Sequence, residues 1–165
     1  MIVVSDASPI INLSIIGELE LLRQLFETVV IPKAVYEEIC IKGKDKPGDK
    51  EVRQSQWIRV NTCENQELAE KLSLILDKGE AEAIALAIQL SSDLLLIDEK
   101  MGKRVARQYH LDTVGLLGVL LEAKQRGLLG SVTNVMSRLR TEANFRIGDD
   151  LFEEVRRIAG EFPRE

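Results

Sequence analysis

The chain of 165 residues is 45% hydrophobic and 30% charged, which is the composition of one globular domain large enough to bury a core. Its net charge of −5 excludes a protein that coats nucleic acid through overall positive charge, so binding a polyanion would require local basic patches or bound cations. No apolar stretch reaches the roughly 20 residues of a membrane helix, and the start of the chain lacks the basic lead of a signal peptide. We therefore expect a cytoplasmic protein that does not contact a membrane.

The first third of the chain alternates between predicted strands and helices. "MIVVS" (1–5) and "TVVIP" (28–32) are β-branched runs typical of buried strands. Between them, Ser8 and Pro9 predict the start of a helix, with Ser8 as its N-cap, and a second helix is expected at 17–26.

The rest of the chain continues this alternation. The middle is expected to contain, in order, a helix opened by Pro32 (33–41), a charged loop (42–50), an edge strand (57–62) and two helices that divide at Lys78 and Gly79 (65–93). The last part is expected to contain a buried strand (94–97), a helix (99–110), a brief strand (112–115), an apolar helix (116–127) and a pair of helices after Gly130. Strands that are continuously apolar predict a mostly parallel sheet covered on both faces, so we expect a three-layer α/β/α fold.

Two acidic residues come directly after buried strands. Asp6 follows the first strand, and Asp98 ends the run "LLLID". Ligands of open parallel sheets bind beyond the carboxyl ends of the strands, where both acids would lie. An acid at this place can also be a turn former or a helix cap. Ser8 leaves Asp6 without a capping role, whereas Asp98 could cap the helix that begins near Glu99.

Two further acids lie on apolar faces of predicted helices. Glu38 follows Ala34 by four positions, on or beside the buried face, whereas Glu37 follows Lys33 by four and forms an ordinary solvent-side pair. Glu80 shares its stripe with apolar residues of "GEAEAIALAIQL". A first-turn acid is favoured by the helix dipole, but that does not explain alignment with the buried stripe.

The four carboxylates of Asp6, Glu38, Glu80 and Asp98 would repel one another if they met without a counter-charge. A carboxylate against an apolar face must be paired, protonated or bound to a metal. Hard oxygen ligands select Mg²⁺ or Mn²⁺, so a site for one of these ions is predicted, with Glu99 as a possible supporting acid.

With these residues the chain resembles the PIN-domain nucleases, especially the small prokaryotic VapC-like toxins. "VVSDASPIINLSIIG" is similar to the opening strand and first acid, and "VVIPKAVYEEI" resembles the second motif, which selects Glu38 over Glu37. "GEAEAIALAIQLSSDLLLIDEKMGKRVA" resembles the third block, whose two acids are Glu80 and Asp98. The chain departs from the family pattern in having Glu80 where many members have Asp, Ser8 where Asn is common, and the additional Glu99. Ser8 and Glu99 are possible supports of the metal site.

The resemblance implies a Rossmann-like fold and metal-dependent cleavage of RNA by Asp6, Glu38, Glu80 and Asp98. It implies a PIN-like nuclease domain at 1–128, and residues 129–165 are expected to form a C-terminal helical extension packed on the same domain. It further implies the toxin component of a toxin–antitoxin pair, inhibited by a proteic antitoxin. Apolar stretches in excess of what one small core can hold favour a homodimer, although each stretch separately also fits the core.

A basic cluster follows Asp98. Lys100, Lys103, Arg104 and Arg107 are candidates for binding RNA phosphates, and for each of them a solvated helix face is the alternative. His110 is the only histidine, which argues against ribonuclease chemistry by a histidine pair.

Two other functions stay open from the sequence. A catalytically idle PIN-like module would bind RNA or a protein, but such a chain should have lost part of the acidic set. Phosphoryl transfer through an aspartyl intermediate at Asp6 usually needs a second acid two residues later, where this chain has Ser8.

Overall fold

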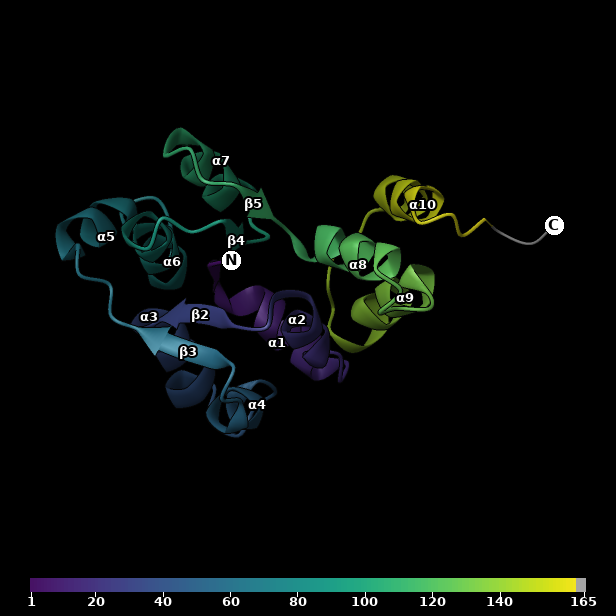
Figure 1. The fold of residues 1–165 in the computed structure, drawn as a ribbon, viewed down its shortest axis with the longest axis horizontal. Helices are drawn as coiled ribbons and strands as arrows, with labels where there is room; N and C mark the ends of the chain where they lie inside the picture. The colour runs from purple at the N-terminus through teal and green to yellow at the C-terminus, as the bar shows by residue number, and fades with distance from the viewer. Residues whose placement is uncertain (163–165) are drawn as a thin grey trace.

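A five-stranded parallel sheet forms the centre of the protein, in a computed structural model that describes residues 1–162 (Figure 1). The strands are β1 (Val3–Ser5), β2 (Val29–Pro32), β3 (Ile58–Asn61), β4 (Leu94–Leu96) and β5 (Thr113–Val114). Their order in the sheet is β3-β2-β1-β4-β5, and every pair is parallel. The direction of chain progression reverses between β1 and β4, which is where open α/β sheets bind their ligands.

Helices cover both faces of the sheet. The first half contains α1 (Ala7–Ile15), α2 (Glu20–Phe26), α3 (Lys33–Tyr36), the π-helix η1 (Glu37–Lys42), α4 (Asp49–Gln54) and α5 (Gln66–Leu72). The second half contains α6 (Lys78–Gln89), α7 (Lys100–Gln108), α8 (Leu116–Gln125), α9 (Val132–Glu142) and α10 (Asp149–Ile158). Figure 1 shows α5 and α6 on one side of the sheet and α8 and α9 on the other.

The two layers of the core follow from the alternation of side chains along β1 and β4. Val3 and Leu96 point into one core, which contains side chains of α1, α2, α8, α9 and α10. Val4 and Leu95 point into the other, against α5, α6 and α7. Since both faces of the central strands are buried, their sequence is continuously apolar. The predicted three-layer α/β fold with a parallel sheet is confirmed.

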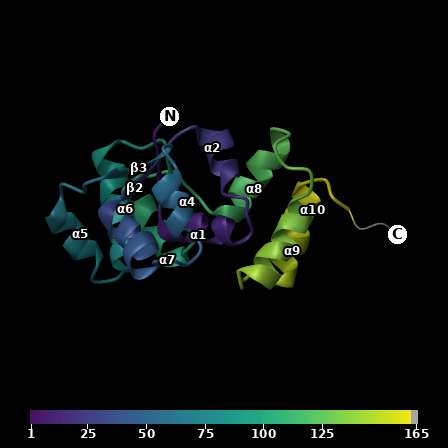
Figure 2. The same ribbon diagram turned by 90° about the horizontal axis from the view of Figure 1, so that it is seen from below.

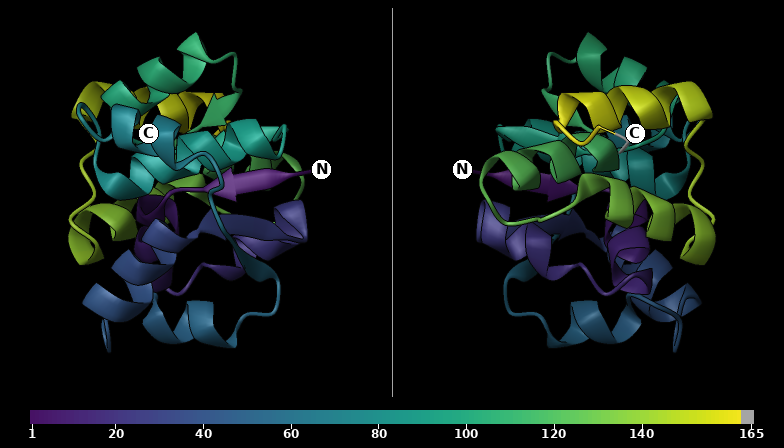
Figure 3. Two further views of the ribbon diagram at one scale, coloured as in Figure 1. Left: turned by 90° about the vertical axis from the view of Figure 1, so that its left-hand side faces the viewer. Right: turned by 90° about the vertical axis from the view of Figure 1, so that its right-hand side faces the viewer.

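The C-terminal helices share the first of these cores. Leu139 of α9 and Phe152 of α10 belong to the same buried cluster as Val3. Figure 2 shows α9 and α10 beyond α8, at the end of the molecule away from α5, and the right view of Figure 3 shows α8, α9 and α10 lying together. The boundary expected at residue 128 stays a prediction, and residues 163–165 of the expected extension lie outside the described part of the chain.

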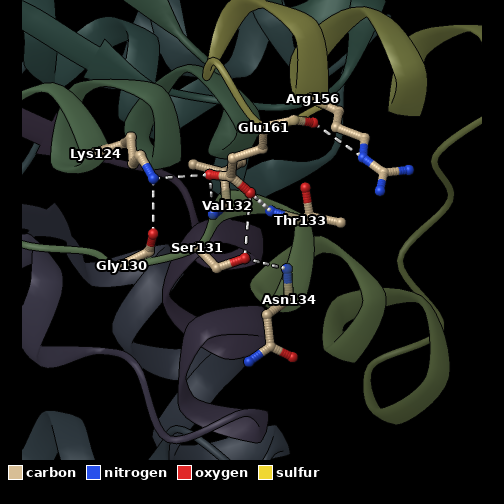
Figure 4. Close-up of polar contacts among 8 residues, drawn as sticks. All are labelled: Lys124, Gly130, Ser131, Val132, Thr133, Asn134, Arg156 and Glu161. Atoms are coloured by element: carbon tan, nitrogen blue, oxygen red, sulfur yellow. Dashed lines mark hydrogen bonds and ion pairs between the residues drawn. The ribbon is translucent and has the colours of Figure 1, made fainter. Parts of the chain in front are cut away.

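The carboxylate of Glu161 connects the segment after α10 to the start of α9 (Figure 4). Glu161 accepts hydrogen bonds from the backbone N–H groups of Val132 (2.8 Å) and Thr133 (2.9 Å) and pairs with Lys124 (3.2 Å). These N–H groups belong to the first turn of a helix and have no partner within it. Glu161 therefore connects α8, α9 and the segment after α10.

Several local predictions were wrong. The first helix begins at Ala7 rather than after Ser8, and its N-cap is Asp6. The break between α5 and α6 lies at residues 73–77, because Asp77 caps α6. Part of the segment expected as a loop at 42–50 is the start of α4, whose first residue Asp49 is buried. Within residues 1–162, no helix has both the length and the apolar content needed to span a bilayer.

Candidate functional site

Asp6 and Asp98 lie at the ends of neighbouring strands. β1 and β4 pair in register, with Ser5 opposite Leu96, and the backbone N–H of Asp6 donates to the carbonyl of Leu96 at 2.9 Å. Asp6 directly follows β1 and Asp98 is the second residue after β4, so both acids leave the sheet at the same edge. This edge is also the reversal point of the sheet order, so the fold places the two acids where a ligand would bind.

Asp6 is buried without using its carboxylate as a cap. Its side chain is 5% exposed, and although Asp6 occupies the N-cap position of α1, it makes no capping hydrogen bond. The expectation that Ser8 caps this helix was wrong, since Ser8 lies inside the first turn, where its hydroxyl accepts from Nδ2 of Asn12 at 3.0 Å. Asp6 is thus a buried acid whose carboxylate makes no capping hydrogen bond to the helix that follows it.

Asp98 caps a helix, but a different one from the helix expected. α7 has Glu99 at its N-cap position, and Oδ1 of Asp98 instead accepts from the backbone N–H of Leu116 at 2.8 Å, at the start of α8. Its second oxygen, Oδ2, is buried and has no hydrogen-bond partner among the described residues. A buried carboxylate oxygen without a partner costs free energy, so this oxygen is a candidate for a ligand that the chain itself does not supply.

Glu80 is held in the first turn of α6 by a residue that sequence reasoning missed. The carboxylate of Asp77 accepts from the backbone N–H of Glu80 at 2.8 Å and so begins the helix. Glu80 is only 6% exposed. The spacing of an acid three residues before a Glu at the start of an apolar helix is a capping pattern, and it could have identified Asp77.

Carboxylates from three separate segments surround Gly79. A Cβ atom on this residue would lie 3.2 Å from Oε1 of Glu38 and 3.4 Å from Oδ1 of Asp6. It would also lie 3.5 Å from Oδ1 of Asp77. The absence of a side chain at Gly79 therefore leaves space that three negatively charged groups share.

The π-helical turn of η1 separates the roles of Glu37 and Glu38. Both are exposed, but Glu37 turns toward Lys78, with Nζ 3.9 Å from its carboxylate, whereas Glu38 faces the acidic group. π-turns are frequent at functional sites because they change the direction of side chains along a helix. Glu82, by contrast, is a buried acid with a structural contact, since it accepts from the backbone N–H of Ala34 at 3.2 Å.

α7 approaches Glu80 closely and brings Glu99 to the rim of the site. A Cβ atom on Gly102 would lie 2.8 Å from Oε2 of Glu80, so a larger residue there would displace the Glu80 carboxylate. The negative charge of Glu99 raises the pKa of both Glu80 and Asp98. Glu99 therefore adds to the acidic group without being buried in it.

Burial and the repulsion between neighbouring carboxylates raise the pKa values of Asp6 and Glu80. Burial raises the pKa of Asp6 to about 7 against the lowering effect of the Ala7 backbone N–H, and the charges of Asp77, Glu38 and Asp98 raise it further. Burial also raises the pKa of Glu80 to about 8, with added repulsion from Asp77, Asp6 and Glu99.

The other two acids shift in the same direction. Although Glu38 is exposed as a residue, partial desolvation of its carboxylate raises its pKa, with a further rise from Asp77 and a lowering by Lys42. Burial raises the pKa of Asp98 as well, while the Leu116 N–H and Lys103 lower it. All four candidate acids are thus harder to ionise than usual, because they lack a nearby counter-charge strong enough to offset burial and repulsion.

The acidic group has no cation of its own in the described chain. Among residues 1–162, no Lys, Arg or His lies within ion-pair distance of Asp6, Glu38, Glu80 or Asp98. In the same residues, no three His, Cys, Asp or Glu side chains already enclose one ion position. The donor chemistry, a set of carboxylates with one orphaned buried oxygen, fits a hard divalent cation.

A cleft of about 800 Å³ opens beside Asp98. Its lining includes Asp98 and Glu99, the polar side chains of Ser8 and Asn12, and three cations of α7, Lys100, Lys103 and Arg107. Arg104, the fourth basic residue singled out in the sequence, does not line it.

The cationic cleft adjoins the acidic group directly. A Cβ atom on Gly115 would lie 2.7 Å from Nζ of Lys103 and 2.9 Å from Oδ1 of Asp98.

A comparison with known protein families supports the resemblance that the sequence motifs indicate. A family model described as a PIN domain matches residues 2–161, and so takes in the C-terminal helices as well as the residues that carry the sequence resemblance. No curated protein matches the chain. PIN domains are generally nucleases that act on nucleic acids, and those nucleases typically use divalent metals. With a match over nearly its whole length and a five-stranded parallel sheet, the chain belongs to the PIN-domain family.

Proposed function

We propose that the protein is a metal-dependent endoribonuclease that hydrolyses phosphodiester bonds with a bound Mg²⁺ or Mn²⁺. The observation that carries the proposal is the approach of Asp6, Glu38, Glu80 and Asp98 from distant parts of the chain, with raised pKa values and no ion pair among the described residues. A group of this kind is unfavourable for the protein alone. It becomes favourable when a divalent cation binds, because the ion neutralises the repulsion.

The four carboxylates would hold the ion, each positioned by a different element. Oδ1 of Asp98 is fixed by the Leu116 N–H, which leaves Oδ2 available. Asp77 fixes the first turn of α6 and therefore the position of Glu80. The raised pKa values of Asp6 and Glu80 imply that the binding of a cation would displace protons from these carboxyl groups.

A bound divalent ion supplies the activation of a water molecule for in-line attack on phosphorus and the stabilisation of negative charge on the phosphate oxygens. The cations of the adjoining cleft, Lys100, Lys103 and Arg107, would hold the RNA backbone near the carboxylates. Local positive charge is needed for this because the chain as a whole carries a net charge of −5. Glu99 at the rim is a further candidate ligand, and Ser8 a candidate polar contact.

The decisive experiment compares two neighbouring glutamates. RNA cleavage is measured with Mn²⁺ or Mg²⁺ and with EDTA, for the unchanged protein and for Glu38→Gln and Glu37→Gln. We expect cleavage only with metal, a loss of at least about a hundredfold for Glu38→Gln, as for the removal of a charge-stabilising catalytic group, and little change for Glu37→Gln. Cleavage that persists in EDTA, or equal effects of the two substitutions, would remove this mechanism.

Measuring RNA binding and the melting temperature with Mn²⁺, in addition to cleavage, separates the nuclease from an idle binding module. A protein that binds RNA but does not cleave it at saturating Mn²⁺, and whose melting temperature does not respond to the metal, would be a binding module. A metal-dependent rise in melting temperature together with cleavage supports the enzyme.

The biological role is proposed from family resemblance alone. We propose a toxin component that a proteic antitoxin inhibits, and a homodimer in the cytoplasm. Induced expression should arrest bacterial growth for the unchanged protein and not for Asp98→Asn, and sedimentation velocity should show a dimer. Normal growth with active enzyme present would contradict the toxin role without affecting the proposed chemistry.

A further inference from the structure

The cleft beside Asp98 has a second wall that comes from the C-terminal part of the chain. Besides the α7 cations, its lining includes Ala143, Asn144, Phe145 and Arg146, from the turn between α9 and α10, and Leu151 of α10. In Figure 1, β5 and the start of α8 lie between α7 and α10. The cleft is thus formed by segments about 40 residues apart in the sequence, with the acidic group beside it.

Arg146 differs from the other arginines of the C-terminal helices. Arg138, Arg140, Arg156 and Arg157 each form an ion pair with a neighbouring carboxylate. Arg146 is exposed and forms none with any described residue of the chain. Its charge is therefore available to a ligand in the cleft that it lines.

The turn that carries Arg146 is held firmly. The backbone N–H of Phe145 donates to the carbonyl of Leu139 at 3.0 Å, and Asn144 adopts the left-handed conformation (φ 53°) that reverses the chain. On the other side of the turn, Nε of Arg140 donates to the carbonyl of Ile147 at 3.0 Å. A cation on such a turn loses little conformational freedom of the backbone when it binds a ligand, which favours a binding role over a solvated surface charge.

We propose that the turn at 143–148 is the second half of the substrate site and that Arg146 binds a phosphate of the same RNA strand as Lys103 and Arg107. The inference rests on the proposed ribonuclease function. Cations from two separate segments of the lining match a backbone that carries a phosphate at every nucleotide, and the carboxylates of Asp98 and Glu99 in the same lining match the place of the scissile phosphate and its metal. Arg146 contacts substrate in this arrangement but holds no part of the metal site.

The test measures binding separately from cleavage. A 5′-labelled single-stranded RNA oligonucleotide of mixed sequence is titrated by fluorescence anisotropy against cleavage-deficient Asp98→Asn protein in Mg²⁺, with and without Arg146→Gln. Loss of one charged hydrogen bond should weaken binding about tenfold and reduce the dependence of log K on log salt by about one. Arg146→Lys should keep the salt dependence, and Arg157→Gln, an arginine of α10 outside the cleft, should bind RNA normally.

Kinetics and melting complete the design. In protein with all four acids intact, Arg146→Gln should raise KM about tenfold, leave kcat nearly unchanged and leave the Mn²⁺-induced rise in melting temperature unchanged. Equal RNA binding with and without Arg146→Gln, or an equal loss with Arg157→Gln, would overturn the inference while metal-dependent cleavage stands. If cleavage is absent but RNA binding still depends on Arg146, the nuclease proposal fails and the binding wall stands. If the Asp98→Asn protein binds no RNA either with or without Arg146→Gln, and the protein with all four acids does not cleave RNA, both the ribonuclease proposal and the Arg146 inference fail.

Discussion

Asp98 uses one carboxylate oxygen to cap α8 through the N–H of Leu116 at 2.8 Å and keeps the other oxygen buried without a partner among the described residues. The first contact is structural and needs an acceptor. The second oxygen is free for a cation. One side chain can therefore serve both the alternatives that the sequence leaves open, a helix cap and a metal ligand.

Replacing Asp98 in two ways should separate these roles. Asp98→Asn keeps an oxygen for the Leu116 N–H, so the free energy of unfolding without metal should change by no more than about 1 kcal/mol, while the rise in melting temperature with Mn²⁺ is lost. Asp98→Ala should lose both, with a destabilisation of about 1–2 kcal/mol from the missing cap. Thermal melts with EDTA and with Mn²⁺ measure both effects. A full Mn²⁺ response in Asp98→Asn would show that this carboxylate is not a ligand.

The stability of the metal-free protein should fall as the pH rises from about 4 to 8. The pKa of Asp6 is raised from 3.8 to about 7 in the folded protein, so the folded state keeps a proton that the unfolded chain has released. The stabilisation is complete below the unfolded pKa and is lost as the pH passes through the folded value, a loss of roughly 2–4 kcal/mol for this group. Glu80, with its pKa raised to about 8, acts in the same direction.

Urea unfolding in EDTA at pH 5, 6.5 and 8 measures this dependence, and Asp6→Asn should flatten it. Mn²⁺ should reverse its sign, because ligands bind a metal in their ionised form and the affinity rises with pH. Stability in EDTA that is independent of pH over this range would contradict the crowding of these acids.

Gly79→Ala should affect metal binding and stability in opposite directions. Alanine favours a helix over glycine by about 0.5–1 kcal/mol, so the melting temperature in EDTA should stay the same or rise slightly. The new methyl group would enter the space between Glu38 and Asp6, at 3.2 and 3.4 Å from their oxygens, and should weaken the response to Mn²⁺.

Gly130→Ala is the matched control for Gly79→Ala, since a Cβ atom there would contact nothing within 4 Å. It should leave the Mn²⁺ response unchanged. If Gly79→Ala also responds normally to Mn²⁺, the ion does not bind between these carboxylates.

Glu161→Gln should destabilise the fold without affecting the metal. Burial raises the pKa of Glu161, but the N–H groups of Thr133 and Val132 and the charge of Lys124 lower it to about 2. The stabilisation is therefore present above the unfolded value of 4.5 and is lost as the pH falls toward 2. Charge-assisted hydrogen bonds of this kind contribute about 1–3 kcal/mol at neutral pH.

Urea unfolding at pH 7 and pH 3 should show a large difference between Glu161→Gln and the unchanged protein at pH 7 and a smaller one at pH 3. Glu154→Gln, which loses only an exposed pair with Arg157, should change stability by less than about 1 kcal/mol. RNA cleavage at a temperature well below the melting point should be the same for all three proteins. An unchanged free energy of unfolding for Glu161→Gln would show that this contact does not fasten the C-terminal segment.

The sequence by itself determined the layers of the fold and the order of the acids. Runs such as "MIVVS" and "LLLI" are apolar at every position because both faces of a central parallel strand are buried, so strands, their direction and the edge that carries Asp6 and Asp98 could be inferred without coordinates. The helical stripe likewise predicted that Glu80 is buried, and it is 6% exposed in the first turn of α6.

Only the tertiary structure decided which partner each side chain meets. Asp98 accepts a hydrogen bond from the backbone N–H of a residue 18 positions later in the chain. Asp77 lies near the other acids because the turn before α6 points toward Asp6. Arg146 lines the same cleft as cations of α7, which are more than 35 residues away in the sequence. Local sequence pattern reports burial and periodicity, which are properties of one element. Caps between elements and charges across a cleft depend on how elements pack, so they appear only when the chain is folded.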